Sequence, residues 1–289
     1  MKRREFLTFA AAALTLPVRR AFANPLGLPF GFQAWEIAPD MKKDWDGTLK
    51  AMKDFGYSII DLNQVSPYID RPAADLKASF LSHGFTFSNA LWPYQAFANR
   101  FDQTIADSQT LGLSTIVCSP RPRLRTTDDW RSFADELNQF GKRTKAAGLQ
   151  LGYHNHEIEF RKTPEGDVPW DLLMASTDPA LVRFLIDVGN LTFGGGDPYV
   201  YLDKYKTRYY GIHAKDFVKG KAAVPVGSGS LDWTRIFTLA KAANIRNIVA
   251  EVGAYGASTL EGQPLEPPEY SVLELYKRSA AFLRAFSAV

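Results

Sequence analysis

The sequence predicts a single α/β domain with the architecture of a (β/α)8 barrel, and three observations support this fold class. From residue 29 onward, short apolar and β-prone runs alternate with longer helical patterns, which is typical of repeated β/α units around a parallel sheet. Eight such units occur in succession. The chain has 289 residues, of which 46% are hydrophobic, and this length suits one barrel. A doubly wound sheet is the second choice.

The predicted strands are short apolar runs, and the last four of them end in a charged residue or a histidine. They cover residues 29–35, 58–62, 86–91, 114–118, 150–154, 182–187, 209–213 and 247–251. The predicted helices alternate with them and cover residues 46–55, 73–83, 99–111, 128–147, 170–175, 198–205, 232–243 and 271–286. Thr127, Asp128 and Asp129 can cap the start of the fourth helix, and Gly148 suits its end.

Residues 1–23 are predicted to be an export signal, which leaves residues 24–289 for the barrel. A basic start is followed by an apolar run at residues 8–16 and by the small-x-small site Ala21-Phe22-Ala23. The pair Arg3-Arg4 resembles a twin-arginine motif. The apolar run has about ten residues, whereas a membrane span needs roughly 20. We therefore expect the twin-arginine export machinery as a partner, a periplasmic or otherwise exported location, and no stable membrane anchor.

The charge and the cysteine content exclude other classes of protein. Cleavage after residue 23 would remove five basic residues and one acidic residue, which takes the formal charge from +3 to −1. No long basic stripe remains, so nucleic acid is not an expected partner. Cys118 is the only cysteine, which rules out an intramolecular disulfide. It ends an apolar run and is expected to be a buried structural residue.

Polar residues that close the last four predicted strands indicate a site. His154 closes the fifth strand, and Asp187, His213 and Glu251 close the sixth, seventh and eighth. The carboxyl ends of all strands meet at one mouth of a (β/α)8 barrel, where active sites form. Carboxylates and imidazoles without thiolates suit manganese, magnesium, cobalt or zinc with positions left open for a substrate. The sequence therefore predicts one divalent metal site.

Five motifs in the second half of the chain resemble the xylose-isomerase-like sugar phosphate isomerase/epimerase family. They are Tyr153-His-Asn-His-Glu-Ile-Glu-Phe160, Asp187-Val-Gly-Asn190 with Gly195-Gly-Asp-Pro198, His213-Ala-Lys-Asp216, Val226-Gly-Ser-Gly-Ser-Leu-Asp-Trp233 and Val249-Ala-Glu251. The resemblance implies a single metal ion held by Asp187, His213 and Glu251. Relatives usually place a glutamate at the end of strand five, often before an asparagine, and aligning on that asparagine assigns the fourth position to His154. The alternatives for this position are His156, Glu157 and Glu159.

The remaining candidate residues lie at or just after predicted strand ends. Glu251, His156 and Lys215 are candidates for proton handling. The candidate substrate contacts are Gln33, Trp35, Asn89, Trp92, Arg121, Asn155 and Lys215, with Asp61 as a further plausible sugar contact.

The resemblance implies a metal-dependent sugar isomerase or epimerase, which abstracts a proton next to a carbonyl and forms an enediolate. Phosphorylated sugars are scarce outside the cytoplasm, so an exported protein would act on a non-phosphorylated sugar or polyol derivative. A 3-keto-glycoside lyase or hydratase could use the same site. A non-catalytic sugar-binding barrel is the alternative of another class, and a metal-dependent nuclease is disfavoured by the charge and the few histidines. Association into a homo-oligomer is also possible for a barrel of this kind.

Overall fold

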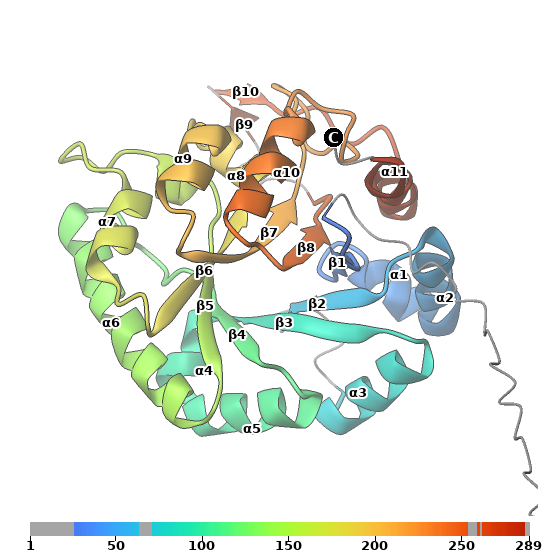
Figure 1. Cartoon of the computed structure of the whole chain (residues 1–289), viewed down its shortest axis with the longest axis horizontal. Coiled ribbons are helices and arrows are strands. Elements are labelled where there is room, and N and C mark those ends of the chain that lie inside the picture. The colour runs from blue at the N-terminus through green and yellow to red at the C-terminus, as the bar shows by residue number, and fades with distance from the viewer. Residues whose placement is uncertain (1–25, 64–70, 254–258, 261, 287–289) are drawn as a thin grey trace, which may run out of the picture.

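Eight parallel strands form a closed barrel in the computed structural model, which describes residues 26–63, 71–253, 259–260 and 262–286. The strands pair in chain order, and β1 closes the barrel against β8 (Figure 1). They are β1 Gly31–Gln33, β2 Ile59–Asn63, β3 Thr86–Trp92, β4 Thr115–Cys118, β5 Gln150–His154, β6 Val182–Asp187, β7 Tyr209–Ala214 and β8 Asn247–Ala250. The predicted fold class is confirmed. The predicted export signal lies outside the described residues.

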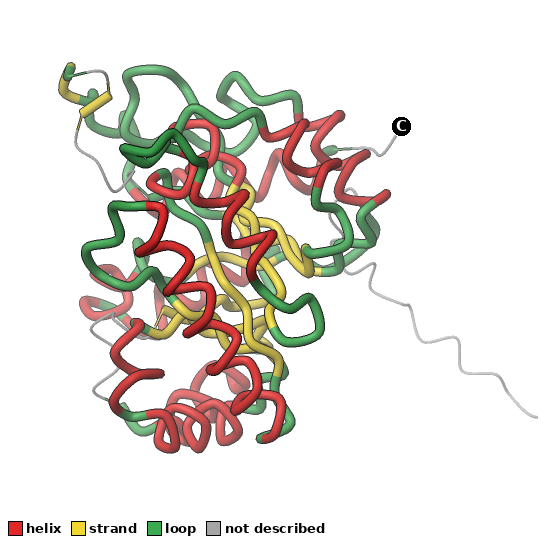
Figure 2. Tube along the Cα trace, turned by 90° about the vertical axis from the view of Figure 1, so that its left-hand side faces the viewer, coloured by secondary structure: helices red, strands yellow, loops and turns green. Residues whose placement is uncertain are grey.

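Helices surround the barrel and bury its outer face (Figures 1 and 2). The longer helices match the predicted ones, and they are α2 Trp45–Phe55, α3 Ala73–Ser82, α5 Phe101–Leu111, α6 Thr127–Ala146, α7 Pro169–Ser176, α9 Pro198–Lys204, α10 Trp233–Ala242 and α11 Val272–Ala285. Thr126 caps α6 in place of the predicted Thr127, because its side chain and that of Asp129 form a reciprocal capping box. In the described part of the chain, no helix has the length and apolar character that a membrane span needs.

Several short elements were not predicted. They are α1 Ala38–Lys43, α4 Tyr94–Asn99, α8 Val188–Phe193, the 3-10 helix η2 Ile158–Phe160 and the paired strands β9 Thr259–Leu260 and β10 Gln263–Pro264. A helix of six residues shows fewer than two turns of apolar periodicity, so the pattern that identifies a long helix is missing. Three of these helices follow the carboxyl ends of β1, β3 and β6, where they border the mouth of the barrel.

Two tyrosines fix the end of the short strand β1. The hydroxyl of Tyr276, on α11, donates to the carbonyl of Gln33 at 2.5 Å. The hydroxyl of Tyr57 in turn donates to the carbonyl of Tyr276 at 2.9 Å. Both tyrosine rings are fully buried, so these bonds are shielded from water. The last helix therefore anchors the first strand and the loop that follows it.

Candidate metal centre

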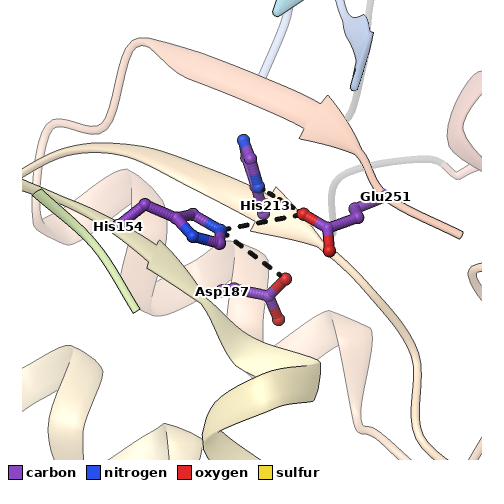
Figure 3. Close-up of side chains that lie close together, drawn as sticks. All are labelled: His154, Asp187, His213 and Glu251. Atoms are coloured by element: carbon purple, nitrogen blue, oxygen red, sulfur yellow. Dashed lines mark hydrogen bonds and ion pairs between the residues drawn. The ribbon is translucent and has the colours of Figure 1, made fainter. Parts of the chain in front are cut away.

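Four buried side chains converge at the carboxyl ends of β5 to β8 (Figure 3). His154 and Asp187 are the last residues of β5 and β6, His213 lies in β7, and Glu251 directly follows β8. One nitrogen or oxygen atom from each residue lies within 4.8 Å of the corresponding atoms of the other three. The structure thus brings together the four residues that the sequence predicted as metal ligands.

The cluster fits a divalent cation. Both ring nitrogens of His154 and the Oδ2 atom of Asp187 are buried without a hydrogen-bond partner among the described residues. Nε2 of His154 lies 3.9 Å from this oxygen and 3.7 Å from Oε2 of Glu251. Divalent cations hold ligands at about 2.0–2.3 Å, so that opposite ligands are roughly 4–4.6 Å apart. A cation among these atoms would satisfy polar groups whose burial is otherwise costly.

The pKa values of the cluster follow from burial and from charge. Burial lowers the pKa of His154 well below its usual range, which keeps the imidazole neutral as a ligand must be. Burial, together with the nearby carboxylate of Glu251, raises the pKa of Asp187 well above its usual range. A cation would reverse the shift of Asp187, because it favours the charged form of a nearby carboxylate.

His213 is held between two carboxylates. Its Nε2 lies 2.6 Å from Oδ2 of Asp61, and its Nδ1 lies 2.7 Å from Oε2 of Glu251. Burial alone would lower the pKa of His213, but these hydrogen bonds outweigh it and raise the pKa to about 10. Asp61 comes from β2 and is fully buried, and its predicted contact with a sugar stays a prediction. Its carboxylate orients His213, as outer carboxylates commonly orient metal-binding histidines.

Asp187 is fixed through its backbone and its side chain. The Asn155 side chain accepts from the Asp187 N–H at 2.8 Å and donates to the Asp187 carbonyl at 3.0 Å. Oδ1 of Asp187 accepts from the N–H of Asn190 at 2.7 Å and so caps α8. Asn155 is fully buried and its amide bonds the backbone of Asp187, so its predicted contact with substrate stays a prediction.

Lys215 extends the cluster and is only 3% exposed. Its Nζ donates to Oε1 of Glu251 at 3.0 Å. Burial alone would raise the pKa of Glu251, but Lys215 and His213 hold it well below its usual range. A Cβ atom on Gly189 would lie 2.7 Å from both Cγ and the carbonyl oxygen of Lys215. Glycine in the Asp187-Val-Gly-Asn190 motif therefore lets α8 pack closely against this lysine.

The cluster opens into a pocket of about 370 Å³. Its lining includes Gln33, Trp35, Glu36, Asn63, Leu91, Pro93, Tyr94, Gln95, Ser119, Pro120, His154, His156, Asn190, Lys215 and Glu251. Gln33, Trp35, His156 and Lys215 were predicted site residues, and the structure puts all four in this wall. Nδ1 of His156 is buried without a hydrogen-bond partner among the described residues.

Four predicted substrate contacts, Asn89, Trp92, Arg121 and Asn155, are not in the lining of this pocket. Asn89 is fully buried and donates to Asp61. Trp92 is buried, and Arg121 forms an ion pair with Glu136 at 2.7 Å. A strand end marks the approach to the mouth, but the direction of each side chain depends on partners that lie far away in the sequence.

Sequence reasoning missed Glu36, Tyr94 and Asn190 as pocket residues. Each follows the carboxyl end of a strand by two to three residues, and this position was the available signal. The glycine-rich motif after β7 has a structural explanation. Asp216 accepts hydrogen bonds from the N–H groups of Gly227 and Gly229 and from the indole of Trp233, which orders that loop. Cys118 is fully buried, as expected.

The fold and the cluster define the class, a (β/α)8 barrel with a metal-site-like centre at the carboxyl ends of its strands. Residues 29–286 match the xylose isomerase-like TIM barrel family, and the chain belongs to this family. An inosose dehydratase of Clostridium tetani is 30% identical over 195 residues, which are 61% of this chain and 61% of that protein. The chain thus spans about three-fifths of the length of this curated relative.

Solved structures share the fold. A sugar phosphate isomerase/epimerase from Parabacteroides distasonis has a TM-score of 0.76 and 25% identity, with 90% of this chain and 98% of that chain covered. A xylose isomerase-like TIM barrel protein from Mycobacterium smegmatis, solved in complex with magnesium, has a TM-score of 0.62 and 15% identity. It covers 89% of this chain and 95% of that chain, and at this identity it supports the fold alone.

Proposed function

We propose that the protein is a metal-dependent enzyme that removes a proton next to a carbonyl group of an uncharged sugar or cyclic polyol. The observation that carries this proposal is the buried cluster of His154, Asp187, His213 and Glu251, which opens into the pocket. The chain also belongs to a family whose solved relatives include a sugar phosphate isomerase/epimerase by name. A non-catalytic sugar-binding barrel would have no need for four buried, converging ligand groups.

His154, Asp187, His213 and Glu251 would hold the cation. When bound, a divalent cation acts as a Lewis acid that stabilises negative charge on a substrate oxygen. Manganese, cobalt, magnesium and zinc all suit this set of imidazole and carboxylate ligands. The protein itself must then position the substrate carbon and accept its proton.

Among the three residues predicted to handle protons, His156 is the best base. It lines the pocket, and its buried Nδ1 has no hydrogen-bond partner among the described residues, so no described group occupies this nitrogen. Glu251 is a poorer base, because Lys215 and His213 both donate to its oxygens and favour its charged form. Lys215 supplies a fixed positive charge beside the reacting oxygen.

The pocket favours an uncharged substrate. Lys215 is the one lysine or arginine among the described residues that line it, and this side chain is paired with Glu251. Arg121, the other cationic side chain among the predicted substrate contacts, is paired with Glu136. A phosphate group would therefore find no guanidinium fork of the kind that commonly binds it. The proposed export by residues 1–23 agrees with this substrate class.

Removal of the proton is the first step of isomerisation, epimerisation and elimination alike. The curated relative from Clostridium tetani is an inosose dehydratase by name, which supports elimination of water from a keto-inositol as the outcome to test first. Isomerisation or epimerisation would share the base and the metal, and would differ in where the proton returns. A 3-keto-glycoside lyase or hydratase would use the same elimination with a different leaving group.

The first experiment measures metal content and proton exchange together. Mature protein is analysed by elemental analysis and is then incubated with 2-keto-inositol, D-fructose or D-tagatose in deuterated water. We expect about one divalent metal ion per chain and deuterium incorporation next to the carbonyl. Loss of water from the keto-inositol would identify a dehydratase, and exchange without loss would identify an isomerase or epimerase.

Two double variants provide the comparison. Asp187→Ala/His213→Ala removes two cluster residues and should lose both the metal and the exchange. Asp46→Ala/His83→Ala removes the ion pair between these two residues, whose atoms lie 3.2 Å apart away from the cluster, and should keep both properties. Wild-type protein that carries no metal, or equal loss in both variants, would contradict the proposed function.

A further inference from the structure

Glu36 lies in the pocket wall, three residues after the end of β1, and is not one of the four cluster residues. Its Oε2 atom is buried and has no hydrogen-bond partner among the residues that the structure describes. A buried carboxylate oxygen without a partner is costly, and such groups in native proteins usually meet a ligand or a water molecule. No described residue bonds this oxygen, and the side chain of Glu36 lines the pocket, so we consider a molecule in the pocket as its partner.

Gly253 seats this carboxyl group. A Cβ atom on Gly253 would lie 1.7 Å from Oε1 of Glu36 and 2.2 Å from its Cδ, so a side chain at position 253 would displace the carboxyl group from its present position. Gly253 follows Glu251 by two residues. The absence of a side chain at Gly253 thus leaves space for the carboxyl group of Glu36 beside the end of β8, close to the cluster residue Glu251.

The surrounding charges suit contact with hydroxyl groups. Burial raises the pKa of Glu36 to about 7, and the nearby carboxylate of Glu251 adds to this shift while Lys215 opposes it. A carboxylate accepts hydrogen bonds from hydroxyl groups, and a neutral carboxyl group also donates one. Neither form attracts a phosphate group, and the charged form repels it.

We propose that Glu36, seated by Gly253, is a substrate-binding residue whose carboxyl group bonds hydroxyl groups of an uncharged sugar or polyol. This inference rests on the proposed function and assigns a recognition role to a residue outside the metal cluster. The substrate would then bind in one orientation, in which its reacting carbonyl faces the cluster and one of its hydroxyl groups faces Glu36. Discrimination against phosphorylated analogues follows from the same group.

Two variants test the residue in opposite ways. Glu36→Gln keeps the shape of the side chain and removes its charge, whereas Gly253→Ala keeps the carboxyl group and displaces it from its seat. The probes are myo-inositol and myo-inositol 1-phosphate, with binding to the metal-containing mature protein measured by calorimetry at pH 8. Glu274→Gln, on α11 at the surface, is the control for the substitution.

We expect wild-type protein to bind myo-inositol more tightly than its phosphate. Glu36→Gln and Gly253→Ala should each weaken myo-inositol binding at least tenfold and narrow the preference over the phosphate, because a hydrogen bond to a charged group is lost or displaced. Glu274→Gln should change neither constant more than twofold. Thermal unfolding of each variant shows whether the fold is intact.

Three results would overturn the inference. They are unchanged binding in both folded Glu36→Gln and Gly253→Ala, tighter binding of the phosphate by the wild type, and no binding of myo-inositol by the wild type. Metal content and solvent exchange of the wild-type protein are measured independently. A protein that keeps both while Glu36→Gln binds normally would retain the proposed function and lose only the role of Glu36.

Discussion

The two halves of the barrel divide the site between them. Strands β5 to β8 supply the four buried residues that converge on one point, whereas the loops after β1, β3 and β4 supply most of the opposite wall. The first group consists of charged residues and imidazoles. The second group is mainly aromatic or uncharged and includes Trp35, Tyr94 and Pro120. Under the proposed function, the strands β5 to β8 would provide the reactive groups, and the opposite wall would shape the space for a substrate.

Two carboxylates from the first half cross this division. Asp61 reaches from β2 to the imidazole of His213, and Glu36 reaches from the loop after β1 to the end of β8. Asp61 is fully buried and Glu36 is half-buried, and each lies next to charged groups that belong to the other half. The division therefore describes the majority of residues, and the exceptions are those that join the two halves.

The largest effect on metal affinity should follow from neutralising Asp187, in the half of the barrel (β5 to β8) that supplies the cluster. Asp187→Asn keeps an oxygen that can accept from the N–H of Asn190, so the cap of α8 survives while the charge is lost. We expect metal affinity to fall more than 100-fold, since a ligand should matter more than the outer groups whose loss costs about 10–100-fold. The measurement is competition with a chelator of known affinity.

Asp197→Asn is the matched control for this variant. Asp197 caps α9 through the N–H groups of Tyr199 and Val200 and does not belong to the cluster. It should bind metal as the wild type does. An equal loss of affinity in Asp187→Asn and Asp197→Asn would show that the effect comes from helix capping and would break the comparison between the halves.

Substitution of Asp61, in the other half of the barrel, should have a smaller effect on metal affinity. Asp61→Asn removes the negative charge behind His213 and should weaken metal binding about 10–100-fold, as expected for a carboxylate that orients a ligating histidine. The pKa of His213 should fall at the same time, and the chemical shifts of its ring report this change during a pH titration. Unchanged metal affinity together with an unchanged titration would remove Asp61 from the metal centre.

The sequence predicted the four cluster residues better than it predicted the residues of the opposite pocket wall. His154 was chosen over His156, Glu157 and Glu159 through the family resemblance. Asp187, His213 and Glu251 could be found because each ends an apolar run, and parallel strands bring their carboxyl ends together in any closed barrel. This argument needs only local patterns and the fold class. It requires no knowledge of which side chains touch across the barrel.

The wall could not be predicted in the same way. Arg121 follows a strand and seemed a suitable contact, but Glu136 on α6 holds its guanidinium outside the pocket. Asn155 lies between two histidines of a motif, yet its amide is used by the backbone of Asp187. Such outcomes depend on pairs that are 15 to 32 residues apart, and no periodicity in the sequence encodes them.

Substitutions of Trp35 test the role of the opposite wall in substrate binding without changing the metal ligands. Trp35 lines the pocket and is 44% exposed, and such exposure is unusual for a tryptophan. Trp35→Ala should raise KM for a substrate about tenfold and leave kcat and metal content unchanged, because stacking supports binding. Trp35→Phe should restore most of the affinity. A fall in kcat at unchanged KM would contradict the assignment of recognition to this half.

The smallest effect concerns the loop that carries His156. Glu159 is fully buried and accepts from the hydroxyl of Tyr153 at 2.5 Å and from the N–H of His156 at 2.9 Å. Burial raises the pKa of Glu159 to about 7. The carboxyl group therefore favours folding fully below pH 4.5, its usual pKa, and this stability is lost as the pH rises through about 7.

Glu159→Gln should remove this pH dependence, because a neutral amide is always in the form that burial favours. The shift corresponds to at most about 3 kcal/mol, and relaxation of the loop should reduce the measured gain to about 1 kcal/mol in the free energy of unfolding at pH 8. At pH 4.5 the variant and the wild type should have nearly equal stability. Urea unfolding at both pH values makes the comparison, with Glu274→Gln, whose side chain is 32% exposed, as the control. A gain of equal size at both pH values would show that the effect comes from packing and not from the charge of Glu159.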